Sequence, residues 1–207
     1  MSKSALKGKI VIISSPSGGG KTTICRQLIR KNKNWRFSVS YTTRAKRKGE
    51  INGRQYYFVG QDKFKALREK GFFAESALVH LYYYGTPIKQ LEQAVRKGQV
   101  VLLDVDVKGA ASIKKKYPEA LSIFIRPPSI RELKKRLKRR GTETREQMEV
   151  RLQNAINENQ KYNQFDYVIV NKNINEAVSA ADYMIKSWTV GITFFGRNKS
   201  RTYSVPE

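Results

Sequence analysis

Short apolar segments rich in β-branched residues alternate with longer amphipathic segments along most of the chain, and this alternation limits the possible folds. The apolar segments predict buried strands at residues 9–15, 99–106, 121–125 and 167–170. Apolar residues at helical spacing predict helices at residues 21–31, 107–116, 129–140, 145–163 and 174–188. Strands joined by helices of this length pair in parallel through right-handed crossovers, so we expect an α/β fold in which helices flank a parallel sheet.

The first strand leads into a glycine-rich loop, SPSGGGKTT at residues 15–23, and then into a helix. This setting is typical of a P-loop, because glycines let successive backbone N–H groups face a phosphate and the helix adds its positive N-terminal end. Lys21 can reach the β- and γ-phosphates of a nucleotide, and the Thr22 hydroxyl can bind Mg²⁺. The residues expected around the phosphates are Ser17, Gly18, Gly19, Gly20, Lys21, Thr22 and Thr23.

The loop departs from the usual P-loop pattern at its first position, where Ser15 replaces glycine. Serine fits there only if the backbone angles are open to a residue with a Cβ atom. An ordinary glycine-rich turn is the alternative. The three glycines, the Gly-Lys-Thr sequence and the flanking strand and helix together favour a phosphate site.

Two acidic residues, Asp104 and Asp106, close the apolar segment QVVLLDVD. Alternation along a strand would put both side chains on the same face. A single acid at a strand end is usually a helix cap or a solvated residue. Two acids on so apolar a strand, downstream of a P-loop, favour a metal or substrate site.

Composition excludes several other classes of protein. The chain has 41 Lys and Arg against 17 Asp and Glu, a formal charge of +24 that attracts polyanions such as nucleotides, nucleic acids or anionic lipids. One cysteine and one histidine argue against a disulfide framework and a structural zinc site. No apolar run approaches the roughly 20 residues that span a bilayer, so we expect a soluble, cytoplasmic protein.

The segment 38–85 differs from the rest, because it is rich in Tyr, Arg, Gly and Thr and much of it alternates apolar with polar residues. We expect a small antiparallel insert between the first and second core units. Arg44 and Arg47 lie in this segment, and two guanidinium groups are suited to gripping one phosphate. A solvated basic loop is the alternative for these arginines.

Four blocks of sequence resemble the guanylate kinases, P-loop kinases that transfer the γ-phosphate of ATP to GMP. They are the SPSGGGKTT loop, residues 38–58 (SVSYTTRAKRKGEINGRQYYF), residues 74–86 with VLLDVDVKGA, and residues 136–151 with 166–171. The second block, TTRxxRxGExxGxxYxF, is far more specific than the P-loop. Together the blocks run from about residue 8 to 188.

The resemblance implies ATP and GMP, or dGMP, as substrates, Mg²⁺ at Thr22 and Asp104, and a role in purine nucleotide metabolism. It places the GMP phosphate at Ser40, Arg44, Arg47, Tyr56 and Tyr84. Glu75 is expected to accept hydrogen bonds from N1–H and the 2-amino group of guanine, a pair of donors that adenine lacks. Thr86 is implied near guanine O6, with Asp104 and Asp106 also on the substrate side.

Basic residues are concentrated in residues 126–140, which carry eight basic side chains and one acid. Arg136 and Arg140 lie four positions apart and therefore share one side of the predicted helix. By resemblance, these two arginines and Arg151 close over the ATP phosphates and act in catalysis with Lys21 and Arg44. Asn171 matches the family's adenine-side position, although an Asn at a strand end is equally a turn residue.

The resemblance also implies how the chain is divided. We expect a single guanylate-kinase-like domain with a P-loop NTPase-type core and a mixed α+β insert that binds GMP. A helical lid and a tail of undetermined structure complete it. The predicted segments are the core at 8–37, 98–135 and 150–188, the insert at 38–97, the lid at 136–149 and the tail at 189–207.

Two other functions fit parts of the sequence. Guanylate-kinase-like modules of membrane scaffold proteins bind peptides, but they typically lose P-loop and lid residues that stand here, such as Lys21 and Arg140. RNA binding is suggested by the charge alone, without an aromatic-rich RNA-binding pattern. We therefore expect no specific nucleic acid and no membrane as partner, and a monomer or homo-oligomer.

Overall fold

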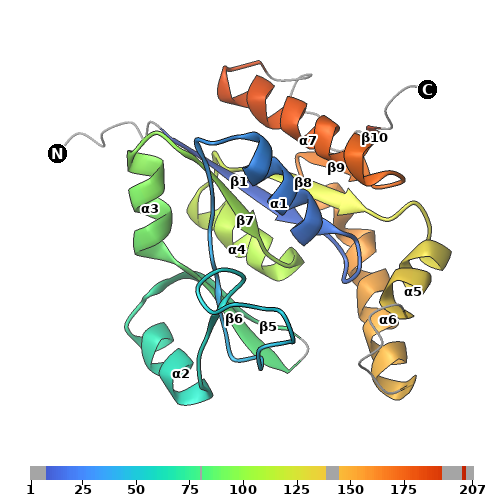
Figure 1. Cartoon of the computed structure of the whole chain (residues 1–207), viewed down its shortest axis with the longest axis horizontal. Coiled ribbons are helices and arrows are strands. Elements are labelled where there is room, and N and C mark those ends of the chain that lie inside the picture. The colour runs from blue at the N-terminus through green and yellow to red at the C-terminus, as the bar shows by residue number, and fades with distance from the viewer. Residues whose placement is uncertain (1–7, 80, 139–144, 193–201, 204–207) are drawn as a thin grey trace.

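The computed structural model describes residues 8–79, 81–138, 145–192 and 202–203. The described chain forms two sheets, a larger one in the upper part of Figure 1 and a smaller one below it. None of the described helices is long and apolar enough to cross a membrane.

The larger sheet has six strands in the order β10-β9-β8-β1-β7-β2, and every neighbouring pair is parallel. This confirms the predicted parallel α/β architecture. β1 lies between β7 and β8, which cover both its edges, and helices pack on both its faces, so its residues are almost all buried. The strands are β1 (Lys9–Ser14), β2 (Trp35–Phe37), β7 (Val100–Asp104), β8 (Leu121–Arg126), β9 (Tyr167–Val170) and β10 (Thr202–Tyr203).

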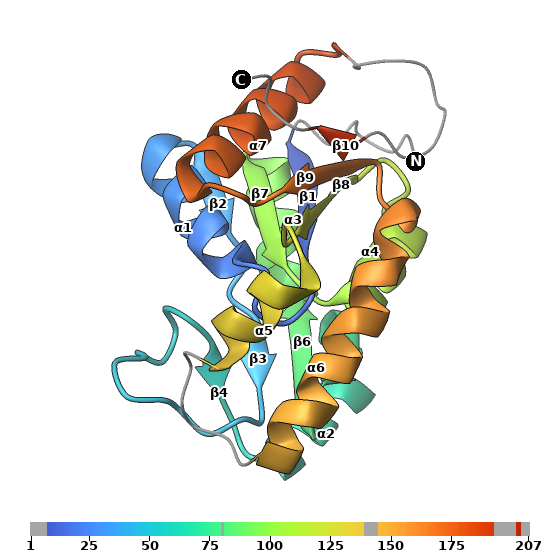
Figure 2. The same ribbon diagram turned by 90° about the vertical axis from the view of Figure 1, so that its right-hand side faces the viewer.

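Helices cover both faces of this sheet (Figure 2). α1 (Lys21–Lys31) and α7 (Ile174–Thr189) pack on the face to which Val11 and Ile13 point. α3 (Ile88–Arg96) and α4 (Val107–Lys116) pack on the face to which Ile10 and Ile12 point. The uninterrupted apolar run of β1 therefore supplies two separate cores, one on each side of the sheet.

The smaller sheet has the order β4-β3-β6-β5. β3 pairs in parallel with β4 but antiparallel with β6, so the sheet is mixed and the prediction of an antiparallel insert is wrong for β4. α2 contributes Phe64, whose ring stacks on Phe73 and Tyr83 with centroid distances of 4.7 and 5.4 Å. The elements are β3 (Tyr41–Thr42), β4 (Tyr57–Phe58), α2 (Gln61–Glu69), β5 (Phe73–Val79) and β6 (Tyr82–Pro87).

α5 (Ile130–Lys138) and α6 (Arg145–Asn159) form a helical hairpin beside the carboxyl end of the large sheet (Figure 1). Leu133 and Leu137 of α5 pack against Ala155 of α6 in a small apolar cluster of their own. The same two leucines would lie 3.2–3.3 Å from a Cβ atom at Gly18, so the hairpin contacts the phosphate loop.

Several predicted boundaries are wrong by a few residues. The strand expected at 99–106 ends at Asp104, and the helix expected at 145–163 ends at Asn159, where a 3₁₀ turn η1 (Gln160–Gln164) begins. The helix expected at 129–140 spans Ile130–Lys138, and residues 139 and 140 lie outside the described chain. β2 was not predicted from the sequence. The tail, for which no structure was predicted, contributes β10.

Candidate active site

A cavity of about 650 Å³ opens where β1 and β7 end, between the large sheet and the small one. Ligands bind at this edge of α/β sheets as a general rule. Its walls bring together most of the residues that the sequence singled out, from segments far apart in the chain. These residues are Ser17, Gly18, Gly20, Lys21, Thr22, Thr23, Ser40, Arg44, Arg47, Tyr56, Glu75, Tyr84, Asp104, Asp106 and Arg151.

The phosphate loop needs glycine at two positions. Gly18 and Gly20 have φ angles of +88° and +98°, in the left-handed region that favours glycine. Gly20 also precedes the first residue of α1, Lys21, and the first turn of the helix lines the cavity with Lys21, Thr22 and Thr23. Loop and helix together provide the donors that a phosphate group requires.

Ser15 is accommodated at the first loop position because its φ angle is not positive. Among the described residues other than glycine, only Leu81 has a positive φ angle. The Ser15 hydroxyl donates to the Pro16 carbonyl at 2.9 Å. A Cβ atom at Gly19 would lie 2.8 Å from both Cβ and Oγ of Ser15. The serine side chain thus occupies the space that a side chain at Gly19 would need.

Lys21, Thr22 and Asp104 meet at the floor of the cavity. The Thr22 hydroxyl donates to Asp104 Oδ2 at 2.6 Å, and Lys21 Nζ lies 3.3 Å from Asp104 Oδ1. Burial lowers the pKa of Lys21 and the Asp104 carboxylate raises it, with a net upward shift that keeps the ammonium group charged. A cation, a hydroxyl and a carboxylate are therefore held together beside the phosphate loop.

The hydroxyl oxygen of Thr22 and the carboxylate of Asp104 suit Mg²⁺. The described residues contain no group of three or more His, Cys, Asp or Glu side chains that could hold a metal. Mg²⁺ needs no such cage, because it is usually bound through one or two carboxylates, waters and substrate phosphates. The hydroxyl of Thr22 and the carboxylate of Asp104, 2.6 Å apart, are ligands of the right kind.

Asp106 is not part of the strand, so the prediction that Asp104 and Asp106 share one face of a strand is wrong. The strand ends at Asp104, and Asp106 is the N-cap of α4, where its Oδ1 accepts from the Gly109 backbone N–H at 2.8 Å. Its carboxylate still faces the cavity. A Cβ atom at Gly109 would lie 3.0 Å from Glu75 Oε2 and 3.1 Å from Asp106 Oδ1, so glycine leaves room for the two acids.

Glu75 is a buried carboxylate on β5 that lines the cavity with only 7% of its surface exposed. Its Oε1 accepts from the Thr86 hydroxyl at 2.7 Å. Burial, reinforced by the charge of Asp106, raises the pKa of Glu75 to about 7, against the lowering effect of the Thr86 hydrogen bond. Thr86 does not itself line the cavity but holds Glu75 in place.

Arg44 is buried and held by Glu50 rather than free in the cavity. One Nη of Arg44 donates to both carboxylate oxygens of Glu50 at 2.8 and 3.0 Å, and its guanidinium lies 5.6 Å from the centre of the Tyr56 ring. The Arg47 backbone N–H also donates to Glu50 at 2.8 Å, while the Arg47 side chain is exposed. Glu50 therefore organises the basic loop around the cavity.

Glu158 of α6 was missed by sequence analysis, although its side chain lines the cavity. Its Oε2 accepts from the Ser17 backbone N–H of the phosphate loop at 3.1 Å. Burial raises the pKa of Glu158. No local motif marks this residue, because a single acid in an amphipathic helix is ordinarily a solvated side chain. The cavity also reaches Arg26, Arg30 and Arg54, none of which was predicted as a site residue.

Four of the described residues that were predicted for the site do not line the cavity: Gly19, Thr86, Arg136 and Asn171. Arg136 donates from Nε to Glu132 at 3.0 Å and from Nη2 to the Asn171 carbonyl at 3.1 Å. The buried side chain of Asn171 donates to the Gly19 carbonyl at 3.0 Å and so supports the phosphate loop from behind. Arg140 lies outside the described residues.

Comparison with known proteins gives a consistent result. The sequence profile of a family described as "Guanylate kinase" matches residues 7–188. A guanylate kinase of Prochlorococcus marinus subsp. pastoris is 44% identical over 86% of this chain and 97% of its own length. A guanylate kinase of Clostridium tetani is 41% identical over 87% and 86%. The chain belongs to the guanylate kinase family.

The solved structures agree with this membership. The crystal structure of guanylate kinase from Anaplasma phagocytophilum matches 88% of this chain and 86% of its own, with a TM-score of 0.75 and 37% identity. The resemblance predicted from the four sequence blocks is thereby confirmed, as is the fold. The roles of individual site residues stay predictions, argued below from the geometry of the cavity.

Proposed function

We propose that this member of the guanylate kinase family transfers the γ-phosphate of ATP to GMP, or dGMP, and releases ADP and GDP. One observation carries the proposal: a buried carboxylate, Glu75, lies in the same cavity as a phosphate loop. The loop suits the triphosphate of one nucleotide. The carboxylate suits the base of another.

Glu75 supplies the base specificity. Guanine presents N1–H and a 2-amino group side by side, and one carboxylate accepts both hydrogen bonds. Thr86 already holds Glu75 Oε1, which fixes the orientation of the carboxylate before the substrate arrives. Adenine has an acceptor at N1 and no group at C2, so AMP would leave the buried carboxylate unpaired at a cost of roughly 2–5 kcal/mol.

The GMP phosphate is bound by the basic loop and the small sheet. Arg44 and Arg47 supply positive charge, and the hydroxyl groups of Ser40, Tyr56 and Tyr84 supply neutral hydrogen bonds. Arg44 is held by Glu50 before the substrate binds, so little of its side-chain entropy remains to be lost.

Phosphoryl transfer asks the protein mainly for alignment and positive charge. The GMP phosphate is already an anionic nucleophile, so no general base is needed. Lys21 holds the transferring group from the loop, and Arg151 from α6, with Arg136 and Arg140 joining them in the closed enzyme. Thr22 and Asp104 would hold Mg²⁺, which neutralises phosphate charge when bound.

We further propose that the segments divide the work. The core (8–37, 98–135 and 150–188) binds ATP, the insert (38–97) binds GMP and the lid (136–149) covers the phosphates. Asn171 serves the ATP side by supporting Gly19 of the loop.

The proposal is tested by measuring ADP release from ATP with GMP, dGMP, AMP or no acceptor. We expect release that depends on GMP and on added Mg²⁺, with AMP at least a hundredfold poorer in kcat/KM. ADP release that is equal with and without GMP would contradict the proposal and favour a non-catalytic binding module of the same fold.

A further inference from the structure

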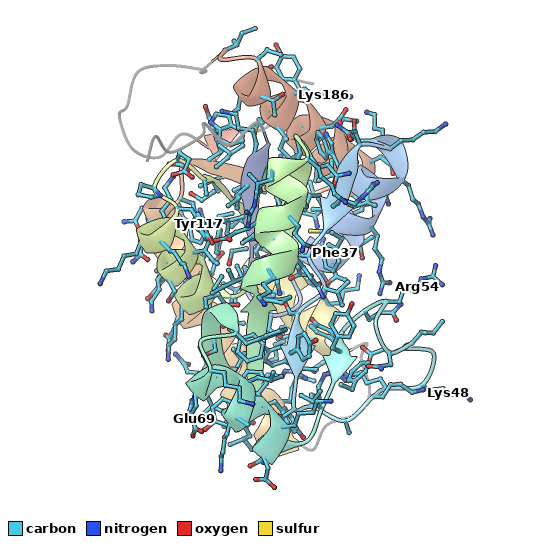
Figure 3. The ribbon with its side chains drawn as sticks, turned by 90° about the vertical axis from the view of Figure 1, so that its left-hand side faces the viewer. Phe37, Lys48, Arg54, Glu69, Tyr117 and Lys186 are labelled. Atoms are coloured by element: carbon cyan, nitrogen blue, oxygen red, sulfur yellow. The ribbon has the colours of Figure 1, made fainter. Side chains whose placement is uncertain are left out.

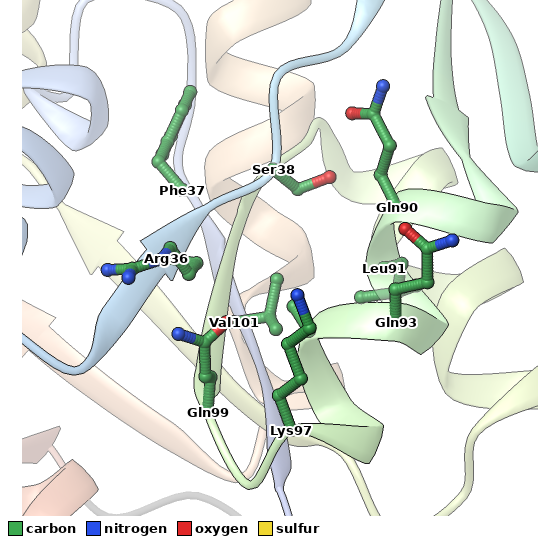
Figure 4. A pocket seen from close by; sticks show the side chains of 10 residues that line it. Arg36, Phe37, Ser38, Gln90, Leu91, Gln93, Lys97, Gln99 and Val101 are labelled. Atoms are coloured by element: carbon green, nitrogen blue, oxygen red, sulfur yellow. The ribbon is translucent and has the colours of Figure 1, made fainter.

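A second cavity, of about 220 Å³, lies between the edge strand β2 and helix α3 (Figure 4). We call it the α3 hollow. Its polar lining comes from both sides, with Arg36 and Ser38 from the strand and its end, and Gln90, Gln93, Lys97 and Gln99 from α3 and the turn after it. Nothing in the phosphoryl transfer described above uses these six side chains.

The charge of the α3 hollow is positive and unbalanced. Arg36 and Lys97 line it, and its lining contains no acidic side chain. Within the described chain neither residue forms an ion pair with a carboxylate. Arg36 is nevertheless held in place, because one Nη donates to the carbonyls of Lys33 and Trp35 at 2.9 and 3.1 Å. A fixed guanidinium with no acidic partner favours an anionic ligand.

Ser38 supplies independent evidence for a ligand. It is 7% exposed, and among the described residues its hydroxyl has no hydrogen-bond partner. In Figure 4 this hydroxyl points from the strand end toward the side where Gln90 and Gln93 lie. A buried hydroxyl that is left unpaired costs stability, so an unpaired one at the wall of a polar cavity indicates a missing partner.

The size and chemistry of the hollow define the ligand class. Its volume is below the roughly 300–1,000 Å³ of pockets for drug-sized ligands, so the ligand is small. Two cations match the charge of about −1.5 to −2 on a phosphate monoester at neutral pH. Serine and three carboxamides suit hydroxyl groups, over an apolar floor that includes Leu91 and Val101. We propose that the α3 hollow is a binding site for a small phosphate monoester with a hydroxylated carbon skeleton.

The position of the hollow couples it to the nucleotide cavity. Both chain connections between the two sheets pass along it: Ser38 leads to Ser40 and β3, and α3 leads from β6 to β7. Phe37 lines both cavities, and in Figure 3 it lies where the upper and lower parts of the molecule meet. A bound ligand therefore changes the affinity for GMP, and by linkage GMP changes the affinity for that ligand by the same factor.

The site is tested by NMR titration of the ¹⁵N-labelled full chain, with ADP and GMP at saturation so that the nucleotide cavity is filled. The probes are glycerol 3-phosphate, ribose 5-phosphate, inorganic phosphate and glycerate, the last as a hydroxylated anion without a phosphate group. We expect saturable shifts of the amide resonances of Ser38, Gln90 and Gln99 with the two esters. Arg36→Gln and Lys97→Gln should weaken binding at least fivefold, and Ser38→Ala at least threefold. Lys89→Gln, on the same helix but outside the hollow, is the matched control and should bind as the parent does.

Three outcomes would overturn the site: no saturable shift with either ester, equal binding by the Arg36 and Lys97 variants and the parent, or equal binding of glycerate and glycerol 3-phosphate. Coupling is measured separately as the Kd of GMP with and without saturating ester. A change of at least threefold is expected, and an unchanged Kd would refute coupling. Only this second measurement rests on GMP being the substrate. ADP release in the assay above tests the kinase activity independently of the hollow.

Discussion

At the scale of single residues, the cavity contains two buried acids with opposite consequences for a nucleotide. Glu75, held by the Thr86 hydroxyl, is proposed to accept N–H groups of a base, while Glu158 accepts from the Ser17 backbone N–H, a donor of the phosphate loop. Both have a pKa raised by burial, so both are held at a cost in stability. In the proposed complex, hydrogen bonds from guanine offset the cost of burying the Glu75 carboxylate. The cost of burying Glu158 is relieved only if Glu158 moves or is displaced.

Glu75→Gln is expected to raise the Kd of GMP at least tenfold, a loss of about 1.4 kcal/mol, because an amide cannot accept both guanine donors at one edge. The affinity for ATP should change less than twofold. Both are measured by calorimetry. Unchanged GMP affinity would remove Glu75 from the site.

A folding defect can be separated from this effect. The pKa of Glu75 is higher in the folded chain, about 7, than its ordinary value of 4.5, so its contribution to stability is lost as the pH rises through 7. The Tm of Glu75→Gln at pH 8 should therefore equal or exceed that of the parent.

GMP affinity is expected to fall in acid, because guanine binding requires the ionised form of Glu75. With a pKa of about 7, the Kd of GMP should rise about tenfold between pH 8 and pH 6. The GMP phosphate also titrates near pH 6 and contributes to the change. Its share is measured in Glu75→Gln. Identical pH profiles for parent and variant would contradict the assignment.

Glu158→Gln is expected to tighten ATP binding at least threefold, because the substitution removes a negative charge 3.1 Å from a phosphate-loop N–H group. Glu69→Gln, an exposed position on α2, is the control for the change in net charge. Weaker ATP binding in Glu158→Gln would show instead that Glu158 supports the loaded loop.

At the scale of elements, the serine at the first position of the phosphate loop restricts which residue can stand at position 19. Ser15 fills the space beside Gly19, so a side chain is excluded there although the φ of Gly19 is ordinary. The triple glycine is thus partly a packing requirement set by the serine. The departure at Ser15 is visible in the sequence, but its contact with Gly19 depends on the folded loop and was not predicted.

Gly19→Ala is expected to weaken ATP binding at least fivefold, because the added methyl group must displace Ser15 or the loop, with an overpacking cost of about 1–3 kcal/mol. The double variant Ser15→Gly with Gly19→Ala should recover most of that loss. ATP affinity and Tm are measured for the full double-mutant cycle. Additive effects of the two substitutions would refute the packing explanation.

Elements with strong periodicity were predicted well from sequence, and those defined by long-range contacts were not. α1, α4 and β9 have the predicted bounds, because apolar spacing and flanking turn residues mark their ends. β2 has only three residues and becomes a strand by pairing with β7, which no local pattern reports. The prediction for Asp106 was wrong because alternation of residues along a strand does not show where the strand ends and the next helix is capped.

At the scale of the whole molecule, a large open cavity lies between the phosphate loop and the small sheet, the two parts proposed to bind the two nucleotides. Motif positions were enough to predict which residues gather there, since Glu75 and the phosphate loop both carry sequence signatures. The contacts that arrange them, such as Glu50 with Arg44, were not predictable because they depend on the folded insert. The proposed division into core, insert and lid stays a prediction.

Binding of both nucleotides is expected to draw the insert toward the core, because phosphoryl transfer requires water to be excluded from a cavity of about 650 Å³. The change is measured by small-angle scattering with GMP and a non-hydrolysable ATP analogue. The radius of gyration should fall when both are bound, and by less with either alone. Equal radii for empty and doubly liganded protein would count against closure.

The position of β1 in the large sheet has a consequence for the order in which the protein is made. Lys9 pairs with Val100 and Val11 with Leu121, so among the described strands of the large sheet β1 is synthesised first and waits through the most residues for its two neighbours. All four strands of the smaller sheet are synthesised before the first partner of KIVIIS, β7, has been made. In a nascent chain arrested before β7, the apolar residues of β1 are therefore exposed and available to chaperones.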